Sequence, residues 1–353
     1  MRQASYKFLK AIQETPSPSG FEQPVQRIVR KYIAPYADEV RTDVHGNVIA
    51  SLNHKAPRRV MLAGHCDQIG MMVNYIDENG YLFFKQIGGI DPSVLPGSRV
   101  VLHTKHGPVD GVVGRKPIHT MKQEERGAKI ELRDMWIDIG VKGKKEAQQV
   151  VAVGDPVTFQ LEMVHLGRNL VTSPGFDNKC GTFVVMEALR LCSIKKIKCA
   201  LFAVSTVQEE VGLRGARTSG YGIDPQVGIA VDVTHATDYP DIDKRVNGEL
   251  KIGGGPTIST GPNINPRLEA MLIAAAKSKR IAYQMEAAPS ATGTDANAIQ
   301  LTRAGVATAL MGIPNRYMHT PVEVVSLSDL EAAAKLLAET VSKIDQRTNF
   351  IPK

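Results

Sequence analysis

Two adjacent glutamates, Glu209 and Glu210, follow an apolar run at residues 200–204 that predicts a buried strand. Side by side and partly desolvated, two carboxylates repel each other unless a cation neutralises one or one stays protonated. Neighbouring side chains point in different directions, so one glutamate can bind a metal while the other faces a substrate. The alternative, on this stretch alone, is a solvated pair near the start of the next helix.

A histidine and an aspartate follow another predicted strand. The strand covers residues 59–63, and His65 and Asp67 come directly after it. Positions i and i+2 of a strand lie on one face, so Asp67 can reach the imidazole of His65. A carboxylate that fixes the tautomer of a metal-bound histidine is a common arrangement. A core histidine beside a solvated aspartate is the alternative for this motif in isolation.

Strands and helices alternate through most of the chain. The patterns predict strands at residues 47–52, 59–63, 198–204, 227–231, 282–286 and 306–311. They predict helices after a capping box at 19–22, around 184–192, at 266–279, from 295 onward and at 327–345. Such alternation implies an α/β fold of the phosphorylase/hydrolase type, a mostly parallel sheet with helices on both faces.

Residues 70–163 have a different pattern. Short strands, such as 100–104 and 109–113, recur between turn signals, and one helical pattern at 144–150 interrupts them. We therefore expect a small all-β domain, a barrel or sandwich, inserted into the α/β domain. The α/β domain would then consist of residues 1–69 and 164–353.

Ligands in an open α/β sheet bind outside the carboxyl ends of the strands. Six acidic or histidine side chains follow predicted strands or lie in loops that can close over that edge: His65, Asp177, Glu209, Glu210, Asp232 and His319. We therefore expect these six side chains to share one crevice.

Two imidazoles and three carboxylates suit two divalent cations with one bridging carboxylate, and they come from His65, Asp177, Glu210, Asp232 and His319. Nitrogen and oxygen donors without thiolate suit zinc, cobalt or manganese. Paired metals lower the pKa of a shared water and polarise a carbonyl group. Glu209 remains free as a general base, so the predicted reaction is metal-assisted hydrolysis of an amide.

Five motifs resemble the tetrahedral, or TET, aminopeptidases of glutamyl, leucyl or lysyl type, some of which carry an endoglucanase label. They are His65-Cys66-Asp67, Asp177-Asn178-Lys179 and the segments 208–216, 232–236 and 317–323. The resemblance covers nearly the whole chain, including segments 114–119 and 136–140 of the insert. The joint spacing of five motifs is far more specific than a lone pair of glutamates.

The resemblance implies roles for seven side chains. It implies one cation on His65 and Asp232, another on Glu210 and His319, a bridging Asp177, a general base at Glu209 acting on a metal-bridging water, and support of His65 by Asp67. It also implies that the insert is a PDZ-like dimerisation domain. The dimers of that family often form a hollow tetrahedral dodecamer that admits unfolded peptides.

Some positions depart from the family pattern or stay open. Gln68 stands where the family often has glutamate, which removes a negative charge beside the metals, and Lys179 replaces a frequent arginine. The substrate preference of any one subgroup therefore need not transfer. Four residues are candidates for contact with substrate or support of the ligands: His235, Gln68, Asp295 and, towards a partner subunit, His119.

Composition excludes other classes of protein. The net charge of +7 comes from 43 basic and 36 acidic residues, and the basic clusters at 142–145 and 195–198 are not interleaved with aromatics as a nucleic-acid surface would be. No apolar run approaches the ~20 residues of a membrane span. The N-terminal residues lack a signal-peptide pattern and the four cysteines form no Cys-x-x-Cys pair, so we expect a cytoplasmic protein with reduced thiols.

We therefore expect a cytoplasmic, homo-oligomeric metallo-aminopeptidase that acts on peptides. A metal-dependent deacylase of N-acylated amino acids shares the chemistry but needs no free amine. A glycoside hydrolase needs two carboxylates and no metal. A peptide-binding or structural assembly protein would take up no metal. A glutamyl preference would need a lysine or arginine in the substrate pocket, which the sequence does not locate.

Overall fold

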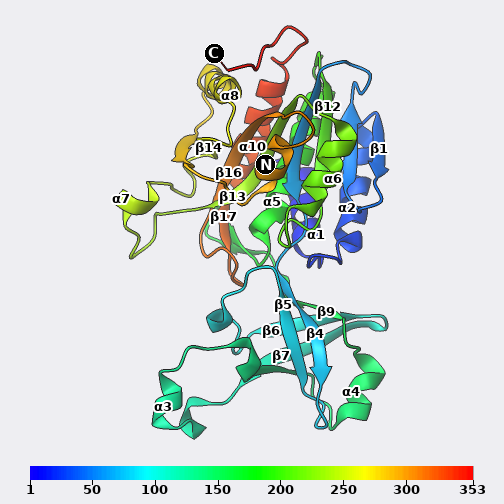
Figure 1. Ribbon diagram of the computed structural model, residues 1–353, viewed down its shortest axis with the longest axis vertical. Coiled ribbons are helices and arrows are strands. Elements are labelled where there is room, and N and C mark those ends of the chain that lie inside the picture. Colours follow the sequence, from blue (N-terminus) through cyan, green and yellow to red (C-terminus); the bar gives the residue numbers. More distant parts are fainter. Residues whose placement is uncertain (353) are drawn as a thin grey trace.

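The computed structural model describes residues 1–352 of the 353-residue chain, with all their side chains except that of residue 125. An α/β body carries a smaller β-barrel, which extends from one end of it (Figure 1). None of the described helices is both long and apolar enough to cross a membrane.

The α/β body is built on one eight-stranded sheet. Its order is β1 (Glu39–Thr42), β2 (Val48–Leu52), β12 (Ala200–Thr206), β3 (Arg59–His65), β13 (Val227–His235), β16 (Ala307–Asn315), β14 (Thr257–Thr260) and β15 (Gln284–Ala287). The four central strands, from β12 to β16, run parallel. Their carboxyl ends therefore meet at one edge.

The prediction of a mostly parallel sheet is right for this centre and too simple at the margins. Strand β2 is antiparallel to both β1 and β12, and β14 is antiparallel to β16. The short connection between β1 and β2 forces an antiparallel hairpin, because a parallel pair needs a crossover of a dozen or more residues.

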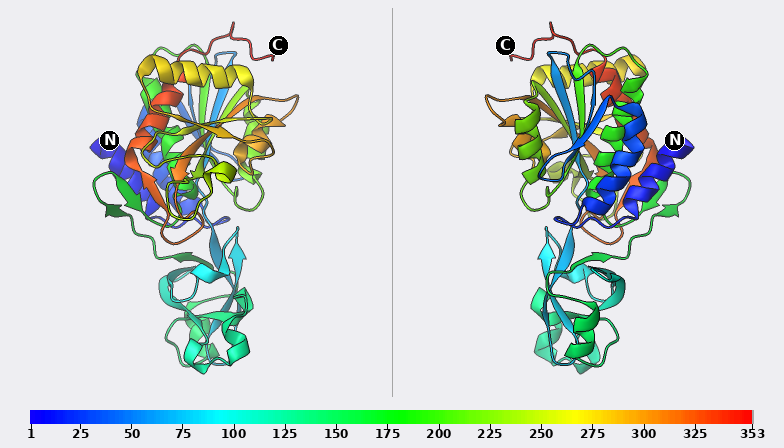
Figure 2. Two further views of the ribbon diagram at one scale, coloured as in Figure 1. Left: turned by 90° about the vertical axis from the view of Figure 1, so that its left-hand side faces the viewer. Right: turned by 90° about the vertical axis from the view of Figure 1, so that its right-hand side faces the viewer.

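Helices cover both faces of the sheet, as predicted (Figure 2). One face carries α1 (Gln3–Gln13), α2 (Gln23–Ile33), α5 (Phe176–Ser193), α8 (Pro266–Lys279) and α10 (Leu327–Val341). The other carries α6 (Arg214–Ile223) and α9 (Asp295–Gln300). The remaining small elements are η1 (Ala34–Tyr36), α7 (Lys244–Asn247) and an antiparallel sheet of β10 (Val164–Leu166), β11 (Leu170–Thr172) and β17 (Val324–Ser326).

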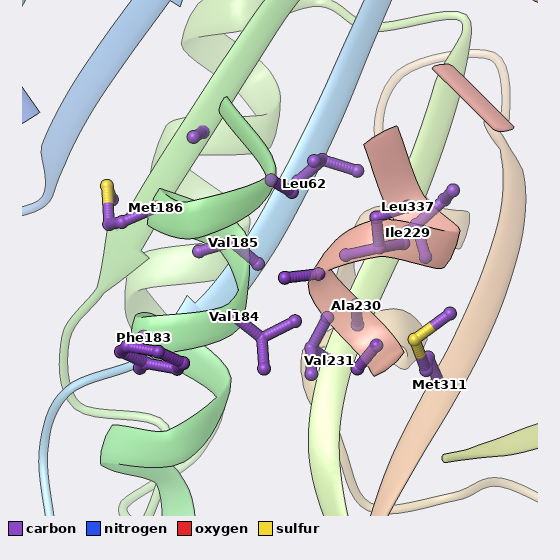
Figure 3. Packing of buried hydrophobic residues seen from close by; sticks show 14 of the residues in the cluster. Leu62, Phe183, Val184, Val185, Met186, Ile229, Ala230, Val231, Met311 and Leu337 are labelled. Carbon is purple, nitrogen blue, oxygen red and sulfur yellow. The ribbon is translucent and has the colours of Figure 1, made fainter. Parts of the chain in front are cut away.

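Helix α5 lies at the centre of the main hydrophobic core (Figure 3). Its residues Phe183 and Val184 are buried together with Leu62 of β3, Val231 of β13 and Leu337 of α10. Burial of each such side chain contributes roughly 1.5–3 kcal/mol. This packing fixes the N-terminal end of α5, which carries Asp177, against the strand that carries His65.

The insert is a closed antiparallel barrel, in the order β4 (Gly70–Ile76), β5 (Leu82–Ile87), β8 (Met135–Asp138), β7 (Gly107–Arg115), β6 (Arg99–Thr104) and β9 (Pro156–Phe159). It has a hydrophobic core of its own, which includes Met71, Leu82, Leu102 and Val157. The small all-β unit expected from the recurring turns is therefore a barrel and not a sandwich.

One predicted feature of the insert is incomplete. Helix α4 (Lys144–Val150) lies where the sequence predicts it, but the insert also contains α3 (Gln123–Arg126) and the 3-10 turns η2 (Pro92–Val94), η3 (Ile118–Thr120) and η4 (Leu132–Asp134). Elements of three or four residues are too short to show a helical period, so they cannot be predicted from the sequence pattern.

The predicted capping box at residues 19–22 is wrong. Helix α2 has Glu22 as its N-cap, without a side-chain cap, and the Ser19 hydroxyl donates instead to Asp67 Oδ2 at 2.6 Å. The Glu22 carboxylate accepts from the Gly20 amide at 2.8 Å. In a capping box the serine hydroxyl would accept a backbone N–H, whereas here it donates to a buried carboxylate, which forms a stronger, charge-assisted hydrogen bond.

Candidate active site

His65 ends the central strand β3 and is almost completely buried. It is paired with Thr206, the last residue of β12, so the segment with Glu209 starts beside it. The preceding Gly64 allows α5 to approach, because a Cβ there would lie 2.4 Å from the Gly181 backbone. Strand pairing and this close approach thus bring three distant segments of the sequence to one place.

Asp177 lies between the two predicted imidazole ligands. Its Oδ1 is 3.3 Å from His65 Nε2, and its Oδ2 is 3.2 Å from His319 Nε2. The amide of Asp177 donates to Glu323 Oε2 at 2.8 Å, and the Glu323 side chain is fully buried. The carboxylate of Asp177 is therefore oriented so that each oxygen faces a different histidine.

The six predicted side chains form two adjoining groups, His65 with Glu209 and Asp232, and Asp177 with Glu210 and His319. Within each group the candidate ligand atoms all lie within 4.8 Å of one another. His65 Nε2 is 3.7 Å from both Glu209 Oε2 and Asp232 Oδ1, and His319 Nε2 is 3.7 Å from Glu210 Oε2. The structure thus brings all six together.

Asp67 supports the cluster from behind. His65 Nδ1 lies 3.0 Å from the Asp67 carbonyl oxygen and 3.4 Å from Oδ1. The same carboxylate accepts the amides of Glu209, at 3.0 Å, and Glu210, at 3.2 Å. The contact with His65 can be predicted from the sequence. The hydrogen bonds from the Glu209 and Glu210 amides cannot, because they join segments about 140 residues apart.

Burial and mutual charge shift the pKa values of the clustered side chains. Burial raises the pKa of Glu209 to about 10, and burial together with the charge of Asp177 raises the pKa of Glu210 well above its usual range. Burial opposes protonation of His65, but Glu209 and the other surrounding carboxylates raise the pKa of its imidazole. Asp177 is the exception, since hydrogen bonds from His319 and His65 outweigh burial and lower its pKa.

The residues present fit divalent cations. The buried Glu210 Oε1 has no hydrogen-bond partner among the described residues, so a lone pair is available to a ligand. Burial raises the pKa of the Cys66 and Cys180 thiols well above their usual value, which keeps both as packing residues. Nitrogen and oxygen donors without thiolate are the set that zinc and cobalt accept, and the cluster opens into a crevice of about 720 Å³.

Several non-glycine residues in and around the cluster adopt left-handed backbone conformations. Among them are Gln208, with φ of 56°, Leu213, with φ of 58°, and His319, with φ of 62°. Such conformations are costly for residues with a Cβ and concentrate at functional sites.

The other candidate residues have different positions. His235 is exposed and lines the crevice. Asp295 lies behind the cluster, where its Oδ2 accepts from Thr206 Oγ1 at 2.6 Å and burial raises its pKa to about 7. His119 is exposed on the barrel, in η3, and does not line the crevice.

Gln68 and Lys179, the two departures from the family pattern, contact each other. The Lys179 ammonium donates to Gln68 Oε1, to the Thr15 carbonyl at 2.7 Å and to the Gln13 carbonyl at 3.4 Å. Burial lowers the pKa of Lys179 to about 7. The side chain of Gln68 therefore faces this lysine, and the expected loss of negative charge applies there and not in the crevice.

The barrel contributes a loop that sequence reasoning treats only as a turn. A Cβ on Gly88, whose φ is +74°, would lie 3.2 Å from Glu210 Oε2, and one on Gly89 would lie 3.5 Å from His319 Nδ1. The missed orienting residue Glu323 has a clearer signal, because it is an acid four residues beyond His319.

Comparison with known proteins agrees with this geometry. The M42 glutamyl aminopeptidase family matches residues 46–336. The lysyl aminopeptidase of Pyrococcus furiosus is 38% identical over 334 residues, which are 94% of this chain and 95% of that protein.

Two solved structures have the same fold over nearly their whole length. A TET aminopeptidase from a marine sediment Thaumarchaeota archaeon is 36% identical, with a TM-score of 0.92 and 97% of each chain covered. The Pyrococcus horikoshii TET1 peptidase, described as able to assemble into a tetrahedron or a large octahedral shell, is 28% identical, with a TM-score of 0.85 over 96% of this chain and 100% of that one. The resemblance to the TET aminopeptidases is thereby confirmed. This chain belongs to the M42 glutamyl aminopeptidase family and is a metallo-aminopeptidase.

Proposed function

We propose that this protein removes the N-terminal residue from peptides at a centre of two divalent cations, zinc, cobalt or manganese. In this proposal His65 and Asp232 hold one cation, Glu210 and His319 hold the other, and Asp177 binds both. The observation that carries the assignment is the position of Asp177, whose two carboxylate oxygens face different imidazoles at 3.3 and 3.2 Å.

When bound, paired cations lower the pKa of a shared water and polarise the carbonyl of the scissile bond. Glu209 is the general base of the proposal. Its Oε2 takes a proton from the attacking water and delivers it to the nitrogen of the leaving amine. Asp67 positions this base through the Glu209 amide and orients His65 through Nδ1.

The charge of the crevice favours a free amine over an acylated one. Carboxylates line it, and the described lining residues include neither lysine nor arginine. A substrate α-ammonium therefore meets opposite charge, while an N-acyl group would bring a neutral amide to the same place. This argues against the deacylase alternative.

The test compares a peptide with its N-acetylated form, for enzyme loaded with zinc, cobalt or manganese. We expect hydrolysis of the free peptide only, loss of activity in chelator and recovery on return of the metal. Equal rates on both peptides would favour the deacylase. Activity on a β-glucan that persists in chelator, without peptide hydrolysis, would favour the glycosidase.

The proposal extends to assembly. Residues 70–163 would act as a PDZ-like dimerisation unit between the two catalytic segments 1–69 and 164–353, and the dimers would form a tetrahedral dodecamer. Apolar side chains exposed on the barrel support this, among them Met72 at 40%, Tyr75 at 49% and Val112 at 48%. Light scattering should give twelve times the chain mass, and a monomer at micromolar concentration would contradict it.

A cytoplasmic location completes the proposal. All four cysteines are buried free thiols, which suits a reducing compartment.

A further inference from the structure

The crevice contains a carboxylate that none of the proposed catalytic roles uses. Glu286 lies on β15, the outermost strand of the sheet, and lines the crevice together with Thr234, Ser259 and Leu310. It is half-buried and belongs to neither group of candidate metal ligands. Its position raises the question of which part of a substrate it meets.

Hydroxyl groups hold the Glu286 carboxylate. Thr257 Oγ1 donates to Oε2 at 2.7 Å, Ser259 Oγ lies 3.5 Å from the same oxygen, and Thr234 Oγ1 donates to Oε1. The Gly312 amide donates to Thr257 Oγ1 at 3.1 Å, which leaves the threonine proton free to point at Glu286. These donors suit an ionised carboxylate, which can only accept hydrogen bonds.

Glu286 has no protein counter-ion in the crevice. Each of its hydrogen-bond partners within residues 1–352 is a hydroxyl, and no lysine or arginine occurs among the described lining residues. A glutamyl side chain in this crevice would meet like charge, whereas a lysyl or arginyl side chain would gain a charge-assisted hydrogen bond.

The separation from the proposed metal centre suits a long side chain. Thr234, which binds Glu286, is two residues beyond Asp232 on β13, so both residues lie on one face with their Cα atoms about 6.6 Å apart. Lysine carries its ammonium on a flexible four-carbon stem that can bridge such a gap. Apolar lining residues, including Ala287 and Leu310, would cover that stem.

We propose that Glu286 determines the specificity of the crevice and that the enzyme prefers peptides with an N-terminal lysine or arginine. The inference rests on the proposed function, since it concerns the side chain of the residue that is removed.

The first experiment isolates the charge of the substrate. Lysyl and norleucyl p-nitroanilides share a four-carbon stem, but only lysine carries the ammonium. We expect kcat/KM of the wild type to be at least about 10-fold higher for lysyl than for norleucyl or glutamyl p-nitroanilide. Equal or higher values for either of the other two would overturn the inference without using any variant.

The second experiment changes the carboxylate. We expect Glu286→Gln to lower kcat/KM for lysyl and arginyl p-nitroanilides by about 10- to 100-fold and to leave the norleucyl value within about 3-fold. Glu249→Gln, the same change on an exposed loop, is the matched control and should alter neither value. An equal fall on all substrates would assign Glu286 a structural role and overturn the inference.

A measurement on the wild type keeps the inference testable even if the Glu286 variant folds poorly or loses its metals. Free L-lysine should inhibit the wild type at least about 10-fold more strongly than L-norleucine, and equal inhibition would count against the inference. The two levels of proposal fail differently. If no free-amine substrate is hydrolysed, the aminopeptidase proposal fails; if norleucyl and lysyl substrates are hydrolysed equally, only the role of Glu286 fails.

Discussion

The barrel and the metal-binding edge of the α/β body differ in where their charged side chains lie. In the barrel, charged residues such as the pair of Lys144 and Glu78 at 2.7 Å lie at the surface, while the hydrophobic cluster fills the interior. At the sheet edge, acidic groups such as Glu209 and Asp232 are buried within 4.8 Å of an imidazole. Several carboxylates buried at one place repel each other unless cations or donors compensate them, so the sheet edge is where function is expected.

The contrast separates residues that serve stability from residues that serve chemistry. Removing a charge from the barrel surface should change little, because exposed ion pairs contribute about 0–1 kcal/mol. Removing a charge from the crevice should change the reaction or the metal content. Four predictions, each with a control in the barrel, test that difference.

Glu209→Gln should have the largest effect. We expect kcat to fall at least ~100-fold, the size associated with loss of a general base, while two metals per chain remain bound. Steady-state kinetics with elemental analysis measures both. The control is Glu78→Gln in the barrel, which should be indistinguishable from wild type. Near-normal kcat in the Glu209 variant would remove that residue from the role.

Asp67→Asn should come next. Asparagine cannot replace the carboxylate that faces His65 and accepts both glutamate amides, so kcat/KM or metal affinity should fall by about 10–100-fold. In the barrel, Asp77 accepts the amides of Asn79 and Tyr81 in a turn. Asp77→Asn should cost only about 1 kcal/mol of unfolding free energy. An inactive Asp77 variant would erase the distinction between the two regions.

Gly88→Ala tests the place where the regions touch. The methyl group would strain a left-handed residue and press on both Ile69 and Glu210, at a cost of about 1–2 kcal/mol, so affinity for one of the two metals should weaken about tenfold. Gly97 has a similar φ of +83° but open space around its Cβ position. Gly97→Ala should lower stability alone, and metal titration of both variants would reveal any exception.

Glu22→Gln should have the smallest effect on activity, and it should change the pH dependence of stability instead. Burial, with a contribution from the charge of Asp67, raises the pKa of Glu22 to about 7 in the folded chain. The folded state therefore holds its proton longer than the unfolded state, so stability is full below about pH 4.5 and falls as the pH rises to 7.

The Gln variant should flatten that fall by about 2–3 kcal/mol, as measured by denaturant unfolding at pH 4.5 and 7. Glu146→Gln, at an exposed position of the barrel, should leave the slope unchanged. A wild-type slope equal to that of the Glu22 variant would show that Glu22 titrates normally.

The five candidate ligands and the candidate base can be located from the sequence, because each follows a predicted strand or lies in a loop that can close over the strand ends. Strand ends gather at one sheet edge by topology, so His65, Glu209 and Asp232 are predictable without coordinates. The boundaries of α8 also follow from the sequence, since Asn265 caps its start and Pro266 occupies its first turn.

The rest depends on contacts between distant segments. The position of β2 between β1 and β12 has no signal in the local sequence. The same is true of the hydrogen bonds that Asp67 accepts from two backbone amides. The same holds for Gly88 against Glu210, and for Glu286, whose segment predicts only a short strand. Sequence patterns therefore locate the chemistry, and tertiary packing decides what surrounds it.

The three acceptors of the Lys179 ammonium have a practical consequence for shortened versions of this enzyme. Two of them are the Gln13 and Thr15 carbonyls, and Ser19 bonds to Asp67, yet the family match starts only at residue 46. A chain trimmed to the matched region would leave the Lys179 ammonium with Gln68 as its one remaining acceptor and Asp67 without the Ser19 hydroxyl. The first twenty residues thus belong to the support of the metal-binding side chains, and a shortened enzyme should keep them.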